Sequence, residues 1–308
     1  MSILHSIDLD GTTNTIDMLG ALEGRSCPEI QSYLFHAANF VGQQTGISSA
    51  KVLKHLRKII LEAVYPQRDQ YEHWGSFPSS DKTLVKITPA VDHFMLIRSA
   101  IEIYLKAQRQ TRRIQQFLAT DWAYAVFKSA SDSSMQDAQM DPDAIEAIDG
   151  LLTRDELAVI LTNSDVKKAE LMLRKAGFGS RMALESVTPG KIGAIGGARK
   201  FEVDVTQPAE SVDLSPYFGF PVQLDLRRRR LVETVRGLVE ATGADRLCVY
   251  TDMPEMEGYP LAKEFGERAR HGMKLNPCSV EGSVRAAREL IGAVTSDRLS
   301  VLVEQLSG

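Results

Sequence analysis

From Ala144 onward, helical patterns alternate with short apolar runs, and few folds accommodate this order. The helical patterns cover 145–152, 166–176 and 231–241, and the strand patterns cover 157–161, 193–205 and 247–250. Strands that alternate with helices are typical of a doubly wound parallel sheet with helices on both faces. We therefore expect an α/β fold with a Rossmann-like core.

A further strand pattern opens the chain. Apolar residues from Ile3 lead into Asp8, and Gly11 follows, so we predict a short buried strand that ends in a turn. Helical patterns separated by breakers then occupy 14–143, which we interpret as a mostly α-helical cap inserted after the first strand. The predicted domains are a core of residues 1–13 with 144–308, and a cap of residues 14–143.

Four helical segments are predicted within this insertion. They cover about 26–46, 48–66, 88 onward and 114–127. Ser26 is the predicted capping residue of the first helix, with Glu29 three residues later. Residues 66–88 hold Pro, Gly, Ser and aromatic residues without clear periodicity, so we predict a loop there.

Composition and charge narrow the possible partners. The 308 residues include 36 Lys and Arg against 40 Asp and Glu, a formal net charge of -4, which is unlike the basic balance of a general nucleic-acid binder. The sequence shows neither a signal peptide nor an apolar segment long enough for a bilayer, so we expect a cytoplasmic protein without a membrane partner. Cys27, Cys248 and Cys278 are widely spaced, and we expect free thiols.

Polar side chains follow three of the predicted strands. The three motifs are Asp8-Leu9-Asp10-Gly11-Thr12, Thr162-Asn163-Ser164-Asp165, and Thr251-Asp252 with Glu255 and Glu257. Ligands of such sheets bind beyond the carboxyl ends of the strands, so we expect these groups to meet in one site. Two carboxylates one residue apart on an extended chain point toward the same side. Asp8 can then act as a nucleophile and Asp10 as a general acid and base.

Phosphate chemistry at this site requires a cation. Phosphate esters carry negative charge that repels Asp8, and clustered carboxylates with a main-chain carbonyl suit Mg²⁺. We expect Asp252 to complete that site. A calcium-binding loop is excluded, because its sixth and twelfth positions require Gly and Glu where this chain has Thr13 and Leu19.

Together the three motifs resemble the haloacid dehalogenase-like hydrolase superfamily, whose first motif is Asp-x-Asp-x-Thr after the first strand. The resemblance covers about 1–13 and 144–275 and does not cover the insertion. It implies a phosphatase-type member that hydrolyses a phosphate monoester through an aspartyl-phosphate with Mg²⁺. Asp10 favours phosphoryl transfer over dehalogenation, because a departing halide needs no acid.

The resemblance also implies roles for individual residues. The Thr162 hydroxyl and the following main-chain N–H hold the transferring phosphoryl group, and donors fixed in this way are the main catalytic tool of such chemistry. Further substrate-binding residues are Thr12, Asn163 and Arg228. The implied metal-binding residues are Asp8, Asp10, Asp252 and Glu257.

Two assignments stay open at this point. The last motif lacks the glycine usual in the superfamily, which leaves Glu255 and Glu257 as alternatives for its second acid. The cation that neutralises nucleophile and phosphate is Lys200 or a member of the run Arg227–Arg230, and Lys200 is favoured. A solvated helix face is the other explanation of the arginine run.

The leading hypothesis is therefore hydrolysis of a small phosphorylated metabolite. One alternative is a phosphomutase or phosphotransferase of the same fold, which product analysis distinguishes. The other is a non-catalytic phosphate-binding regulatory module, which binds phosphate or metal without turnover. No oligomeric state is predicted.

Overall fold

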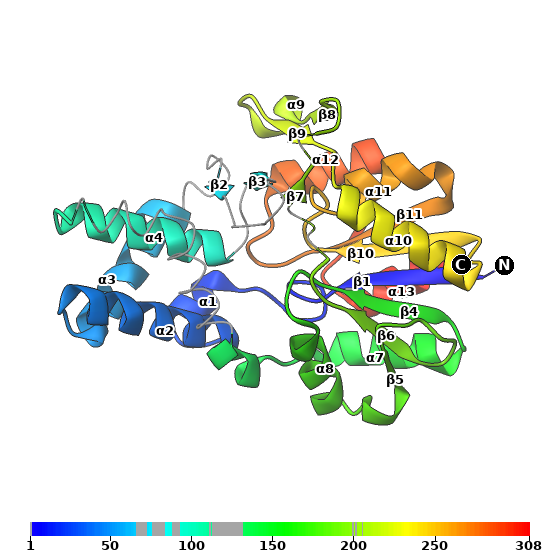
Figure 1. Ribbon diagram of the computed structural model, residues 1–308, viewed down its shortest axis with the longest axis horizontal. Helices are drawn as coiled ribbons and strands as arrows, with labels where there is room; N and C mark the ends of the chain where they lie inside the picture. Colours follow the sequence, from blue (N-terminus) through cyan, green and yellow to red (C-terminus); the bar gives the residue numbers. More distant parts are fainter. Residues whose placement is uncertain are drawn as a thin grey trace. The chain divides into compact units, whose positions relative to one another are not determined.

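The computed structural model describes residues 2–65, 73–75, 84–87, 93–110, 112, 132–198, 200, 202–204 and 206–308. These residues form two compact units. The first comprises Met1–Ile16 with Gln139–Gly308, and the second comprises Asp17–Ala138. The core unit is the first of these, and it contains the sheet shown in Figure 1.

Seven parallel strands form the sheet of the core unit, in the order β12-β11-β10-β1-β4-β6-β5. Their bounds are β1 Ile3–Asp8, β4 Leu157–Leu161, β5 Met182–Leu184, β6 Ile192–Ile195, β10 Arg246–Thr251, β11 Ala269–Lys274 and β12 Val294–Ser296. Helices lie on both faces of this sheet, so the predicted doubly wound α/β fold is confirmed. The predicted strand over 193–205 is shorter than expected, because pairing with β4 stops at Ile195.

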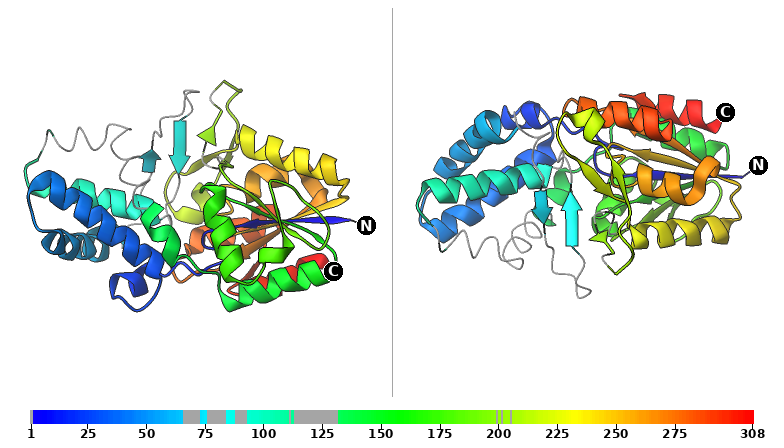
Figure 2. Two further views of the ribbon diagram at one scale, coloured as in Figure 1. Left: turned by 60° about the horizontal axis from the view of Figure 1, so that its bottom comes forward. Right: turned by 90° about the horizontal axis from the view of Figure 1, so that it is seen from above.

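The helices of this unit are α7 Pro142–Thr153, α8 Val166–Lys175, α10 Arg229–Thr242, α11 Gly258–Phe265, α12 Glu281–Ile291 and α13 Leu299–Ser307. Figure 2 shows α7 and α13 on one face of the sheet and α10 and α11 on the other. Helix α10 places Leu231, Val235 and Val239 at helical spacing against buried strand residues such as Val159 and Val249. Each fully buried side chain of this kind stabilises the fold by about 1.5–3 kcal/mol.

A small hairpin lies between β6 and α10. Strands β8 (Ser211–Asp213) and β9 (Gln223–Asp225) pair antiparallel, and the short helix α9 (Ser215–Phe218) connects them. Leu214, Val222 and Leu224 pack with Tyr259 and Ala286 in a separate apolar cluster. The hairpin is therefore anchored by side chains of α11 and α12.

The second unit is mostly helical in its described part. It contains α1 Met18–Leu22, α2 Pro28–Thr45, α3 Ser49–Ile59, the π-helix η1 Ile60–Val64, α4 His93–Ala107 and the short 3₁₀ helix η3 Met135–Asp137. Gly46 ends α2 in the left-handed conformation, with φ of 73°, as its position in the sequence predicts. The predicted helix start at 88 and the predicted helix over 114–127 lie outside the described residues.

Two predictions for the second unit are wrong. The predicted loop over 66–88 contains the antiparallel strands β2 (His73–Gly75) and β3 (Leu84–Ile87). Leu, Val and Ile in β3 favour a strand. The strand was missed because the four residues are too few to show a clear periodicity. Ser26 does not cap α2, because its hydroxyl donates to Asp17 Oδ2 at 2.9 Å and Cys27 occupies the capping position.

The remaining expectations concern thiols and membranes. Cys27, Cys248 and Cys278 form no disulfide bond in the described structure. None of the helices in the described part of the chain combines the length and the apolar character needed to cross a bilayer.

Candidate active site at the strand ends

The turn after β1 brings the first motif to the edge of the sheet. The Thr13 main-chain N–H and hydroxyl both donate to the Leu9 carbonyl, at 3.0 and 2.7 Å, so the chain turns back directly after the strand. Gly11 adopts φ of 80°, and a Cβ atom there would lie 1.9 Å from Asp252 Oδ2. Only glycine allows this close approach of the β1 loop to the β10 loop.

Sheet register explains why the three motifs meet. Asp8 at the end of β1 pairs with Leu161 of β4, and Ile7 pairs with Tyr250 of β10. Each neighbouring strand therefore ends within a residue or two of Asp8. The polar residues that directly follow β4 and β10, the two strands that flank β1, are Thr162 and Asp252.

Asp8 forms a partly buried ion pair with Lys200. Lys200 Nζ lies 2.6 Å from Asp8 Oδ1 and also pairs with Glu257 Oε1. Burial raises the pKa of Asp8, and the ammonium group opposes that rise. Burial likewise raises the pKa of Glu257 to about 8, again against Lys200. The pKa of Lys200 itself is raised, because the two carboxylates outweigh the effect of its burial.

This cluster concerns the two assignments left open by the sequence, the cation beside the nucleophile and the second acid of the last motif. Lys200, the favoured cation, lies against Asp8, whereas Arg227 pairs with Asp225 and Arg229 with Glu233. Glu257 faces Lys200. The Ser283 hydroxyl donates to Glu255, which is also buried and has a raised pKa through burial.

Asp10 is held by a second lysine. Lys168 Nζ lies 2.6 Å from Asp10 Oδ1, and the Ser164 hydroxyl donates to Oδ2 at 3.3 Å. The Lys168 side chain is 2% exposed and that of Asp10 is 26% exposed, so the carboxylate retains access to solvent. Sequence reasoning missed Lys168, because a lysine on a helix usually lies at the surface and no pattern in the sequence marks this one as buried.

The two carboxylate oxygens of Asp252 have different surroundings. Its Oδ2 accepts a hydrogen bond from Asn276 Nδ2 at 3.3 Å, while Oδ1 is buried without a hydrogen-bond partner among the described residues. Burial and the negative charge of Asp8 raise the pKa of Asp252 well above its usual range, and Glu257 and Asp10 add to this effect. A buried carboxylate oxygen in this setting suits a cation as its partner.

The geometry of the acids limits how a metal can be held. In the described part of the chain, no three His, Cys, Asp or Glu side chains are grouped for metal binding. The four acids of the implied metal set thus do not form one shell of carboxylates. Two carboxylates, Asp8 and Asp252, together with a main-chain carbonyl and water, still fit the oxygen ligands and incomplete protein shell typical of Mg²⁺.

The residues implied in phosphate binding take different positions. Thr162 is buried, and its hydroxyl accepts from the Ser164 N–H at 3.0 Å. Asn163 Oδ1 accepts the Lys200 N–H at 2.6 Å and so helps to place that lysine. Thr12 is buried, and its hydroxyl has no hydrogen-bond partner among the residues described.

Arg228 is fully buried at the start of α10. Its Nε and Nη1 atoms have no hydrogen-bond partner within the described ranges. Burial lowers the pKa of this guanidinium to about 10, although Asp225 opposes the change. A buried guanidinium with two nitrogens that lack hydrogen-bond partners among the described residues is costly, which makes Arg228 a candidate for contact with an anion.

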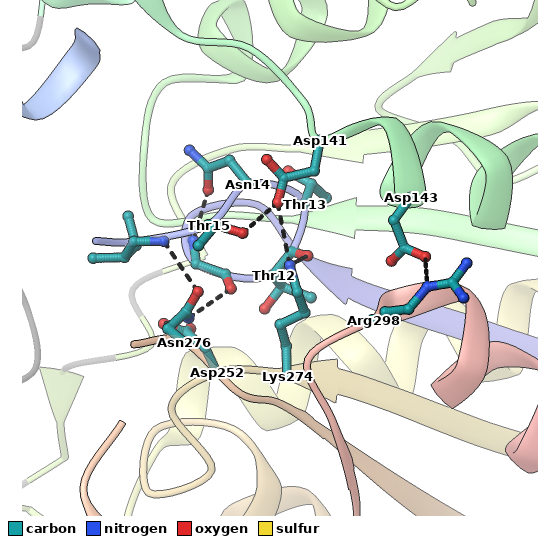
Figure 3. A network of polar contacts seen from close by, with 12 residues as sticks. Thr12, Thr13, Asn14, Thr15, Asp141, Asp143, Asp252, Lys274, Asn276 and Arg298 are labelled. Carbon is teal, nitrogen blue, oxygen red and sulfur yellow. Dashed lines mark hydrogen bonds and ion pairs between the residues drawn. The ribbon is translucent and has the colours of Figure 1, made fainter. Parts of the chain in front are cut away.

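A polar network supports the loop after β1 (Figure 3). Lys274, at the end of β11, is buried and lies 3.3 Å from Asp141 Oδ2 and 3.4 Å from the Thr12 carbonyl. The Thr15 hydroxyl donates to the same Asp141 oxygen at 2.6 Å, and the Asp141 N–H donates to the Thr13 carbonyl at 2.8 Å. The segments that leave and re-enter the core unit are thereby joined to β11, a connection that sequence reasoning missed.

The fold and the site together define a doubly wound α/β protein with paired lysines and carboxylates at the strand ends. No family profile and no curated protein matches the sequence. Two similar solved structures are a dehalogenase with an intermediate complex and a haloacid dehalogenase-like hydrolase, described as putative, from Burkholderia xenovorans LB400. Each is 12% identical; the first alignment covers 100% of this chain and 97% of that chain with a TM-score of 0.38. The second covers 99% and 97%, with a TM-score of 0.42.

Proposed function

We propose that the protein is a Mg²⁺-dependent phosphohydrolase that acts on a small phosphate monoester through an aspartyl-phosphate. One observation carries this proposal: Asp8 and Asp10 stand at the end of the central strand, and each carboxylate is held by its own buried lysine. Such an arrangement separates a nucleophile from a general acid and base within one motif.

Mg²⁺ is the cofactor in this proposal. Asp8 and Asp252 would supply carboxylate oxygens to the ion, and the main-chain carbonyl of Asp10 would be its third protein ligand. The Oδ1 atom of Asp252, which is buried without a hydrogen-bond partner among the described residues, supports this choice. When bound, the ion neutralises charge on the phosphoryl group and on the acids around it. In this proposal Glu257 holds Lys200 in place and is not a direct metal ligand.

The reaction then follows from the residues of the chain. Asp8 forms a bond to phosphorus as the ester P–O bond breaks, and the leaving oxygen takes a proton from Asp10. Water next attacks phosphorus and gives its proton to Asp10, while the bond to Asp8 breaks and inorganic phosphate leaves. Lys200 balances negative charge at Asp8, and the Thr162 hydroxyl holds the phosphoryl group in place.

The proposed substrate site includes Arg228, Thr12 and Asn163. The buried guanidinium of Arg228 is suited to a phosphate or another anionic group of the substrate. The same holds for the Thr12 hydroxyl, which has no hydrogen-bond partner in the described part of the chain. Asn163 contacts Lys200, so we propose that it acts on the substrate through that lysine.

The first experiment is Mg²⁺-dependent phosphate release from a panel of phosphorylated metabolites and an activated aryl phosphate. The parent protein and Asp8→Asn are compared, with thermal unfolding as a check that the variant folds. We expect release by the parent alone and none after chelation of the metal. Equal release by Asp8→Asn refutes the mechanism, and ester consumption without free phosphate identifies transfer to another hydroxyl.

A further inference from the structure

Asn276 connects three loops at the candidate metal site (Figure 3). It lies two residues beyond β11, and it is buried. Its Nδ2 atom donates to the Gly11 carbonyl at 2.8 Å and to Asp252 Oδ2 at 3.3 Å. Its Oδ1 atom accepts the Ile16 N–H at 3.0 Å. One side chain thus contacts the β1 loop, the β10 loop and the end of the first core segment.

These contacts determine the orientation of the amide. Nδ2 has two protons, and both have an acceptor, whereas Oδ1 faces a main-chain donor. A flipped amide would place Nδ2 against the Ile16 N–H and Oδ1 against two acceptors, so only one orientation satisfies the network. The Ser279 hydroxyl accepts the Asn276 N–H at 2.9 Å and fixes the main chain as well.

The fixed amide has a direct consequence for Asp252. Its Oδ2 atom is held between Asn276 and the backbone of Gly11, which approaches too closely for any Cβ atom. The other oxygen, Oδ1, is left buried without a hydrogen-bond donor from the described residues. Oδ2 is therefore hydrogen-bonded within the protein, and Oδ1 can bind a ligand.

We infer that Asn276 is a positioning residue for divalent-cation binding, which it serves by orienting Asp252 and the loop after Asp8. This inference rests on the proposed Mg²⁺ site. Residues that orient a metal ligand commonly change metal affinity by about 10- to 100-fold when removed. Loss of the Asn276 amide is expected to raise the Kd for Mg²⁺ by about that factor.

Isothermal titration calorimetry with Mg²⁺ on the full chain measures this affinity without any substrate. We compare the parent with Asn276→Ala, and use Asp252→Asn as the variant that removes the ligand itself. Asn39→Ala is the matched control, because Asn39 lies in α2 of the second unit and takes no part in the contacts of Asn276. The expected order of Kd is parent and Asn39→Ala, then Asn276→Ala, then Asp252→Asn.

The outcomes separate this inference from the proposed function. If the parent binds no Mg²⁺, both are overturned. If the parent binds and Asn276→Ala binds equally well, only the role of Asn276 is overturned. Should Asn276→Ala fail to fold, Ser279→Ala removes the contact that fixes the Asn276 main chain. A raised Kd in that milder variant supports the inference, and an unchanged Kd overturns it.

Discussion

Lys168 offers the sharpest test of how Asp10 works. Its ammonium lies 2.6 Å from Asp10 Oδ1, and we expect the pair to hold the carboxyl group of Asp10 where its protonated form can give a proton to a leaving oxygen. A hydrogen bond to a charged group contributes about 1.5–3 kcal/mol. If that energy is spent on orienting Asp10, Lys168→Met lowers the rate of the acid-assisted step by about 10- to 150-fold, since 1.4 kcal/mol corresponds to a factor of ten.

The leaving group of the substrate distinguishes this role from general damage. An alkyl phosphate needs a proton on its departing oxygen, whereas an activated aryl phosphate does not. The ratio kcat/KM reports the steps up to phosphoryl transfer to Asp8, before the water step that both substrates share. We expect kcat/KM of Lys168→Met to fall by the full factor for alkyl esters and by much less for aryl esters.

The assay compares the parent, Lys168→Met and Lys167→Met on both substrate types. Lys167 is the matched control, because it is exposed on the same turn of α8. Asp10→Asn should show the same dependence on leaving group in a stronger form. Equal losses on alkyl and aryl esters would refute the reasoning, since a structural defect lowers both alike.

Three further predictions concern burial and backbone geometry. Lys200→Met leaves Asp8 and Glu257 without their cation, so we expect the free energy of unfolding in urea at pH 7 to fall by about 3–5 kcal/mol; an unchanged value contradicts the buried cluster. Gly11→Ala should abolish Mg²⁺ binding and turnover because its Cβ meets Asp252 Oδ2, whereas Gly24→Ala, at φ of 77° with open space around it, should retain both; retained binding in Gly11→Ala refutes the close approach. His271 is buried with neither ring nitrogen hydrogen-bonded among the described residues, and burial lowers its pKa from 6.5 to about 4. The neutral ring therefore stabilises the fold fully above pH 6.5, and this contribution of about 3 kcal/mol is lost as the pH falls toward 4. In urea unfolding, the free energy of unfolding of His271→Phe should fall less between pH 6.5 and 4 than that of the parent. Equal falls in the two proteins would contradict the prediction.

The sequence by itself determined the doubly wound core and the location of the acids. Periodicity reveals helices and buried strands because it is a local property, and parallel strands must carry their carboxyl ends to one edge. Asp8 at the end of β1 followed from these two facts. Gly11 was recognisable as a turn residue, but its contact with Asp252 was not.

Only the tertiary structure decided which charged side chains serve the site. Lys168 and Asp10 are 158 residues apart, and in sequence a lysine on a helix looks like an ordinary surface residue. Lys200, the favoured cation, and the run Arg227–Arg230 were open alternatives until the fold placed the lysine against Asp8.

Strand β11 was missed for a related physical reason. Its sequence Ala-Arg-His-Gly-Met-Lys has no apolar run, and its burial comes from pairing between β10 and β12. Lys274 and Asn276 reach the β1 loop because that pairing carries them there. A local pattern cannot report burial that is created by neighbouring strands, so the residues that orient the candidate site emerged only from the folded chain.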